Sequence, residues 1–295
     1  MGSGSWTTQS FTNYSASVGR SVNSDGTLRG NYSAQDMFTR RRIATELDPK
    51  NVIRECVDNA EHPCTKPVIL ALDVTGSMGK AAVEVAKQIN TVMTELYSKV
   101  SDIEFMVMGI GDLAYDNAPL QVSQFESDIR IAEQLDKVFF EGGGGGNGYE
   151  SYSAAWYFGL HHTKLDCWNR GQKGIIITMG DEPLNPYLPR NILSNITGDG
   201  VEANIETSQL YEEAKQKFDI YHLNVEHGTS GRFHNDIHRT FGKYLDSKHL
   251  IDTSVDSIVN DIIDIIVNAH NSTGETVATS NPTETTAVFT DGISW

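Results

Sequence analysis

The sequence predicts an α/β fold in which a mostly parallel sheet is covered by helices on both faces. Two observations lead to this fold class. Apolar runs of strand length recur along the chain, and segments with helical periodicity separate most of them. Because parallel strands need crossover connections, which are usually helices, this alternation predicts a doubly wound α/β/α sheet of three layers. A length of 295 residues and an apolar share of 39% are sufficient for one such core.

The elements can be predicted in chain order. The apolar run 67–73 ends in a carboxylate and is typical of a buried parallel strand. Apolar residues then recur at helical spacing over 85–96, which predicts a helix directly after a short loop. We expect further strands at 103–110, 174–179, 218–225 and 250–251, and further helices at 125–135, 150–161, 206–217 and 255–266.

The composition divides the chain into three parts. Residues 1–34 contain 20 Ser, Thr, Gly or Asn, so residues 1–65 are expected to be a polar arm that is partly ordered at most. Residues 66–268 carry the apolar runs and form the expected domain. Residues 269–295 are expected to be a flexible tail, because Ser, Thr, Asn and Gly are again abundant there.

Charge and cysteine content exclude several classes of function. The net charge of −16 argues against nucleic acid and anionic membranes as partners. No apolar run approaches the length of a membrane span, and no signal peptide is apparent, so a cytoplasmic location with three reduced cysteines is expected. Residues 101–150 hold ten acidic and two basic residues. We expect one face of the molecule to attract cations. We also expect a partner to carry basic residues around the acidic group with which it binds the metal.

Three predicted strands end in an acidic residue, which is where ligands bind in open α/β sheets. These residues are Asp73, Asp112 and Asp181. Asp73 is followed at alternate positions by Thr75 and Ser77 on a tight loop that enters a helix. One carboxylate and two hydroxyls on one loop form a set of hard oxygen ligands, which suits Mg²⁺, with Ca²⁺ and Mn²⁺ as alternatives. Helix capping is the competing explanation for these three side chains.

The pattern Asp73-x-Thr75-x-Ser77 after an apolar strand resembles the start of the metal-ion-dependent adhesion site of von Willebrand factor A (VWA) domains. The resemblance covers about residues 66–268 and implies a Rossmann-like sheet. It also implies a third-loop Asp, for which Asp181 is the match. The family's second-loop Thr is absent from the run Gly142–Gly148, and Glu150 or Ser151 takes that place.

The resemblance implies cation-dependent protein–protein binding or assembly without turnover, in which an acidic group of a partner completes the metal shell. A bacterial or phage intracellular branch is suspected, with an AAA+ ATPase of the MoxR group or a larger assembly as partner. Two alternatives remain open. One is a Mg²⁺-dependent phosphatase of the haloacid dehalogenase type with Asp73 as nucleophile. The other is a structural protein of a phage or multi-subunit particle. The oligomeric state is left open.

Overall fold

The computed structural model describes residues 4–143, 146–226 and 233–275, and a six-stranded sheet lies at its centre. The strand order is β12-β11-β8-β4-β5-β6, in which β6 is the antiparallel edge strand and the other pairs are parallel. The bounds are β4 (Lys66–Asp73), β5 (Ile103–Ile110), β6 (Leu120–Val122), β8 (Gly174–Gly180), β11 (Phe218–Glu226) and β12 (Leu250–Ser254). The predicted fold class is confirmed. The chain order reverses between β4 and β8, which makes the carboxyl ends of these two strands the switch point.

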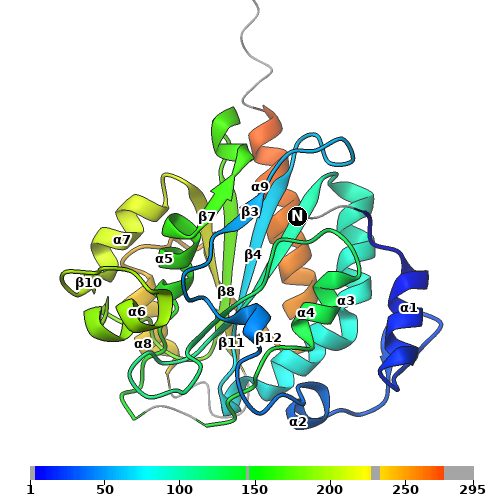
Figure 1. Ribbon diagram of the computed structural model, residues 1–295, viewed down its shortest axis with the longest axis horizontal. Coiled ribbons are helices and arrows are strands. Elements are labelled where there is room, and N and C mark those ends of the chain that lie inside the picture. Colours follow the sequence, from blue (N-terminus) through cyan, green and yellow to red (C-terminus); the bar gives the residue numbers. More distant parts are fainter. Residues whose placement is uncertain (1–3, 144–145, 227–232, 276–295) are drawn as a thin grey trace, which may run out of the picture.

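Helices cover both faces of the sheet (Figure 1). One face carries α3 (Gly79–Lys99), α4 (Arg130–Leu135) and α9 (Ile258–Glu275), and the other carries α5 (Ser153–His161), α6 (Arg190–Thr197), α7 (Thr207–Ala214) and α8 (His234–Phe241). Alternation along β4 explains the two layers. Val68, Leu70 and Leu72 belong to the core on one face, and Ile69 and Ala71 to the core on the other.

Two of the helices that begin later than predicted are preceded by backbone pairing, and the helix expected from 255 also begins later, at Ile258. The helix expected from 125 begins at Arg130, because Glu126 forms an antiparallel bridge with Phe105 of β5. The helix expected from 150 begins at Ser153, because Glu150 forms a parallel bridge with Leu184. The first of these segments pairs with a strand of the central sheet, and the second forms a bridge to the segment after β8.

The N-terminal arm differs from the expectation of partial order. From residue 4 onward it contains α1 (Thr8–Ser17), β1 (Ser21–Val22), β2 (Leu28–Arg29), α2 (Ala34–Met37) and β3 (Arg54–Cys56), and β3 pairs with β7 (Thr163–Leu165). Trp6, Phe11 and Met37 are buried in the same hydrophobic core as α3. A few large apolar side chains, placed where they reach α3, are enough to order an otherwise polar segment.

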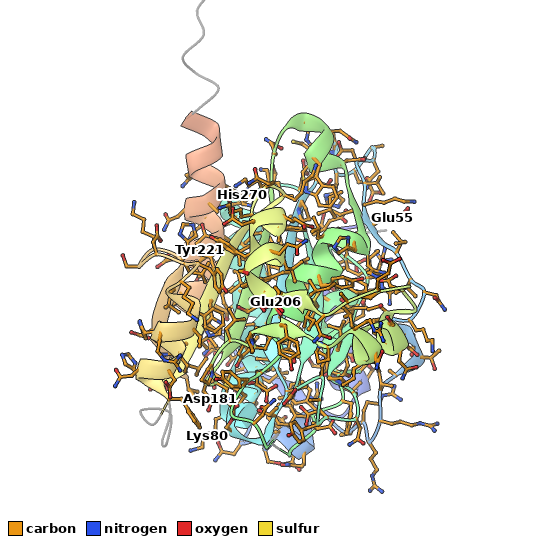
Figure 2. The ribbon with its side chains drawn as sticks, turned by 90° about the vertical axis from the view of Figure 1, so that its left-hand side faces the viewer. Glu55, Lys80, Asp181, Glu206, Tyr221 and His270 are labelled. Atoms are coloured by element: carbon orange, nitrogen blue, oxygen red, sulfur yellow. The ribbon has the colours of Figure 1, made fainter. Side chains whose placement is uncertain are left out.

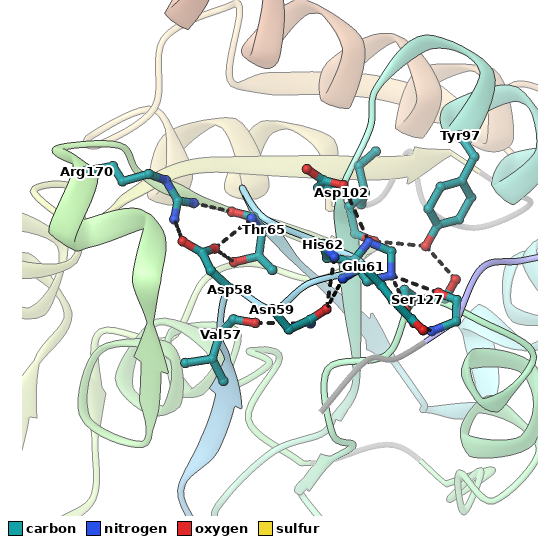
Figure 3. Close-up of polar contacts among 12 residues, drawn as sticks. Val57, Asp58, Asn59, Glu61, His62, Thr65, Tyr97, Asp102, Ser127 and Arg170 are labelled. Atoms are coloured by element: carbon teal, nitrogen blue, oxygen red, sulfur yellow. Dashed lines mark hydrogen bonds and ion pairs between the residues drawn. The ribbon is translucent and has the colours of Figure 1, made fainter.

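Polar contacts fix the last part of this arm where it enters β4 (Figure 3). Asn59 Oδ1 accepts hydrogen bonds from the amides of Glu61 and His62, both at 2.9 Å. Asp58 Oδ1 accepts from the Thr65 amide and hydroxyl, and the Arg170 guanidinium pairs with the Asp58 carboxylate. These contacts join the arm to the segment before β8.

The C-terminal boundary also lies beyond the predicted one. Helix α9 continues to Glu275, so residues 269–275 are helical, while 276–295 lie outside the described residues. Within the described ranges, no helix combines the length and apolar character needed to cross a bilayer.

Candidate metal centre at the carboxyl edge of the sheet

The first loop of the candidate site follows β4 directly and brings its oxygen-bearing side chains together. Asp73 is fully buried, and its Oδ1 accepts hydrogen bonds from the Thr75 amide at 2.8 Å and the Thr75 hydroxyl at 2.7 Å. The Ser77 hydroxyl donates to Asp181 Oδ1 at 2.9 Å, which connects this loop to the residue that follows β8. The four residues that the sequence placed at two separate strand ends therefore meet at one edge.

Helix capping does not account for these residues. The N-cap of α3 is Met78, and the N-cap of the short 3₁₀ turn Gly76–Met78 is Thr75. Neither position makes a side-chain capping hydrogen bond. The Thr75 hydroxyl bonds instead to the Asp73 carboxylate, so these side chains interact with one another at the sheet edge and not with the helix terminus.

The glycine-rich second loop lies directly against the first loop. The Glu141 amide donates to the Val74 carbonyl at 3.0 Å, and the Gly76 amide donates to the Gly143 carbonyl at 2.9 Å. A Cβ on Gly76 would come within 2.9 Å of the Gly142 carbonyl oxygen. This close approach of two backbones therefore requires glycine at position 76.

Glu150 reaches the site from a backbone that is fixed on both sides. Its amide donates to the Pro183 carbonyl at 3.1 Å, and its carbonyl accepts from the Asn185 amide at 3.2 Å. The Glu150 side chain is fully buried, and neither carboxyl oxygen has a hydrogen-bond partner among the described residues. Burying a carboxylate without a donor or a counter-ion is costly, so this group is placed where a cation would stabilise it.

Burial and mutual repulsion raise the pKa values of the carboxyl groups at this edge. The pKa of Glu150 is raised far above its ordinary value, mainly by burial and then by the charges of Asp73 and Asp116. Burial and the Asp181 charge also raise the pKa of Asp73, although the hydrogen bonds from Thr75 act in the opposite direction. A set of like charges of this kind favours protonation without a cation and favours ionisation when a divalent ion is present.

Ser151, the other candidate for the second loop, has a different role in the structure. It is buried, and its hydroxyl oxygen accepts a hydrogen bond from the Leu113 amide at 3.0 Å. Asp112 lies on the same turn, where its Oδ1 accepts a hydrogen bond from the Ala114 amide. Ser151 therefore connects the turn after β5 to the segment that carries Glu150, and both residues stay candidates for the second loop.

The donor set fits a hard divalent cation such as Mg²⁺ better than a transition metal, because it consists of carboxylate and hydroxyl oxygens. Within the described residues, no three of these carboxylates have oxygens that all lie within 4.8 Å of one another. A cation at this edge would therefore contact at most two carboxylates directly. Hydroxyl and water oxygens would complete its shell.

Ser77 is the exposed residue among the candidate ligands. Ser77 is exposed, whereas Asp73 is buried, so the deep part of the site is carboxylate and the rim is a hydroxyl. Figure 2 places Asp181 and Lys80 at the same end of the molecule, opposite to His270.

Sequence reasoning missed Tyr152, whose hydroxyl donates to Asp73 Oδ2 at 3.0 Å and is fully buried. A Cβ on Gly180 would lie only 1.7 Å from this hydroxyl oxygen, so the glycine that ends β8 provides the room for it. The available signals were a glycine at the end of an apolar strand and a tyrosine next to the second-loop candidates. Neither signal indicates by itself that the two residues meet.

The acidic residues of the stretch 101–150 are distributed over both ends of the sheet. Strand β5 crosses the molecule, so Asp102 and Glu104 at its start lie at the other end of the sheet from Asp112 and Asp116. Asp112 and Asp116, after the end of β5, are near enough for their charges to raise the pKa of Glu150. Charge counted along the sequence therefore overstates the charge at this edge.

Comparisons with known proteins identify no family for this chain. The sequence matches no protein-family model and no curated protein. Among solved structures, the chain is similar to the pilus adhesin SpaC from Lactobacillus rhamnosus GG, with 12% identity and a TM-score of 0.46, over 74% of this chain and 31% of the adhesin. It is similar to the vWF domain of the type V pili tip protein Mfa5 from Porphyromonas gingivalis, with 11% identity, a TM-score of 0.46, and 75% and 99% of the two chains covered. It is also similar to the SpRpn10 VWA domain, with 11% identity and a TM-score of 0.40, over 68% of this chain and 94% of that domain. Such distant likenesses assign no function.

Proposed function

We propose that the carboxyl edge of the sheet binds Mg²⁺ and that the bound ion captures an acidic group of a protein partner. The observation that carries this proposal is the fully buried Glu150 carboxyl group, whose two oxygens have no partner among the described residues. A divalent cation would supply the missing counter-charge. Ca²⁺ and Mn²⁺ have the same preference for oxygen ligands and remain the alternative ions.

The residues have distinct roles in this proposal. Thr75 and Ser77 contribute hydroxyl oxygens, and Glu150 contributes a carboxylate from the second loop. Asp73 and Asp181 hold these hydroxyls through hydrogen bonds and contact the ion directly or through water. When the ion is bound it acts as an electrostatic anchor for a carboxylate, and the exposed position of Ser77 is the side from which that group approaches.

The start of α3 supports recognition of an acidic partner. The N-terminus of this 21-residue helix carries a partial positive charge, which favours an approaching carboxylate. Lys80 is exposed in the first turn and adds a full positive charge at the same end of the molecule as Asp181. An AAA+ ATPase, or a subunit of a larger assembly such as a phage particle, is the class of partner that fits the resemblance to adhesion sites.

A phosphatase is less consistent with this geometry. A nucleophilic Asp must meet the phosphoryl group, but Asp73 has no exposed surface. Its two oxygens accept hydrogen bonds from Thr75 and Tyr152, which leaves no unengaged oxygen facing solvent. We therefore propose binding without turnover.

Isothermal titration calorimetry with Mg²⁺ on the wild type and on Asp73→Ala tests the metal site. Saturable heat in the wild type and none in the variant is expected, and equal heats in both would contradict the proposal. Turnover of p-nitrophenyl phosphate by the wild type, lost in Asp73→Asn, would favour the phosphatase. A pull-down in Mg²⁺ and in EDTA, with Ser77→Ala as the rim variant, then tests partner capture.

A further inference from the structure

A second group of side chains that can bind metals lies away from the carboxyl edge of the sheet with Asp73, Glu150 and Asp181, which we call the acidic edge. His234, His238 and Asp252 each offer an atom, and these three atoms all lie within 4.8 Å of one another. His238 Nε2 is 2.8 Å from Asp252 Oδ1, and His234 Nδ1 is 3.9 Å from the same oxygen. The two imidazole rings face each other with centroids 4.4 Å apart. Two imidazoles therefore converge on one carboxylate oxygen.

The fold explains why these residues meet. His234 and His238 are four residues apart on α8, so they share one face of that helix. Asp252 comes from the edge strand β12, and α8 packs on the neighbouring strand β11. Residues on β8, β11 and β12 stand in register as Gly180, Asn224 and Asp252, so the cluster lies two strands away from the acidic edge. Two strand spacings correspond to about 10 Å.

A buried side chain orients the carboxylate from behind. Asn224 is 1% exposed, and its Nδ2 donates to Asp252 Oδ1 at 2.7 Å. Its own Oδ1 is buried without a hydrogen-bond partner in the described part of the chain. Supporting hydrogen bonds of this kind hold ligand carboxylates in place at metal sites. The Asn224 amide thus gives the cluster a fixed outer contact, which an incidental surface ion pair does not need.

We propose that His234, His238 and Asp252 form a transition-metal site of the Zn²⁺ class, separate from the acidic edge. Two imidazole nitrogens and one carboxylate oxygen are the ligands that Zn²⁺ accepts, whereas Mg²⁺ prefers oxygen alone. Ligand atoms around tetrahedral zinc stand about 3.3 Å apart, which follows from bonds of about 2.0 Å. The observed 2.8 Å and 3.9 Å lie on either side of this separation, so small rotations of the side chains are sufficient.

The described residues supply three ligands of this proposed site, which would connect two elements. The three side chains are each 38% exposed, so water or a partner's side chain can reach a bound ion. The ion would join α8 to β12, with the segment 227–232 between β11 and α8 lying outside the described residues. The alternative is a simple ion pair, in which His238 alone binds Asp252 and His234 contributes nothing.

Equilibrium dialysis of the untagged full chain against Zn²⁺, in millimolar Mg²⁺ to fill the acidic edge, tests the proposal. We expect one Zn²⁺ per chain in the wild type and an affinity at least about tenfold lower in His234→Ala, His238→Ala and Asp252→Asn. His249→Ala is the matched control. His249 directly precedes β12 and forms its own ion pair with Asp246 at 2.7 Å, so it is a histidine near the cluster that does not belong to it. Its affinity should equal that of the wild type.

Three further measurements complete the test. Thermal melts in EDTA check that each variant is folded, and Asp252→Asn keeps the size of the side chain if an alanine variant fails. Co²⁺ should give tetrahedral visible bands in the wild type that disappear in His238→Ala. Asp73→Ala should bind Zn²⁺ like the wild type, which separates this site from the proposed Mg²⁺ site. Equal Zn²⁺ affinity in the wild type and in His234→Ala, or no Zn²⁺ binding at all, would overturn the proposal.

Discussion

Replacing Glu150 by Gln should change stability in opposite directions with and without Mg²⁺. Gln has the shape of a protonated Glu but carries no titratable proton. The pKa of Glu150 is raised from 4.5, mainly by burial, so the metal-free fold holds a proton that the unfolded chain releases. Stability that is fully present below pH 4.5 is therefore lost as the pH rises. At pH 7 the loss of stability reaches up to about 3 kcal/mol. This follows from the interval of about 2.5 pH units between the ordinary pKa of 4.5 and pH 7, at about 1.36 kcal/mol for each unit.

In EDTA, Glu150→Gln should therefore be more stable than the wild type, by up to about 3 kcal/mol at pH 7. With Mg²⁺ at about 100 times its Kd, the wild type gains about 2.7 kcal/mol, or a Tm increase of about 5 to 11 °C. If the variant binds about 100-fold more weakly, the same concentration adds only about 0.4 kcal/mol, or roughly 1 °C. Mg²⁺ binding to the wild type should also release protons.

Thermal melts with EDTA and with Mg²⁺, together with calorimetry in buffers of different ionisation enthalpy, measure these effects. Glu104→Gln is the matched control. Glu104 is 1% exposed and burial raises its pKa to about 7, but it lies at the opposite end of β5. This control should keep the full Mg²⁺ shift. The reasoning fails if Glu150→Gln is no more stable than the wild type in EDTA and still shows the wild-type Mg²⁺ shift.

Four other predictions concern the surroundings of the site and the arm. Tyr152→Phe removes a hydrogen bond to Asp73 and should weaken Mg²⁺ binding about 10- to 100-fold in calorimetry. Gly180→Ala should destabilise the fold by about 1–3 kcal/mol, and adding Tyr152→Phe should restore part of this loss in urea denaturation. Burial lowers the pKa of His222 to about 3, so the fold excludes a proton that the unfolded chain binds below pH 6.5. Stability should fall by about 2 kcal/mol from pH 6.5 to about pH 5, and pH profiles that are parallel in wild type and His222→Gln would contradict this. Trp6 is 7% exposed and donates from Nε1 to Asn90 at 3.0 Å, so Trp6→Ala should cost about 3–5 kcal/mol. An unchanged urea midpoint would show that the arm does not contribute to the fold.

Local patterns were sufficient for five of the six strands of the central sheet and for the first loop of the candidate site. The strand that ends in Asp73 was predicted because burial on both faces leaves a continuous apolar run. The helix that follows it was predicted because its buried residues recur at helical spacing. The short edge strand Leu120–Val122 was not predicted, because three residues carry too little periodicity. The order of the arm was also missed, since its few apolar side chains become informative only when they contact α3.

The sequence by itself determined the α/β class, the strand ends, and the oxygen-rich loop from Asp73 to Ser77, because these depend on periods of two to four residues. Only the tertiary structure decided that the buried carboxyl group beside this loop is Glu150 and that Tyr152 supports Asp73. It alone placed Asp252 of β12 against the histidines of α8. These are contacts between residues far apart along the chain, and no local period encodes which distant side chains meet when the sheet is assembled.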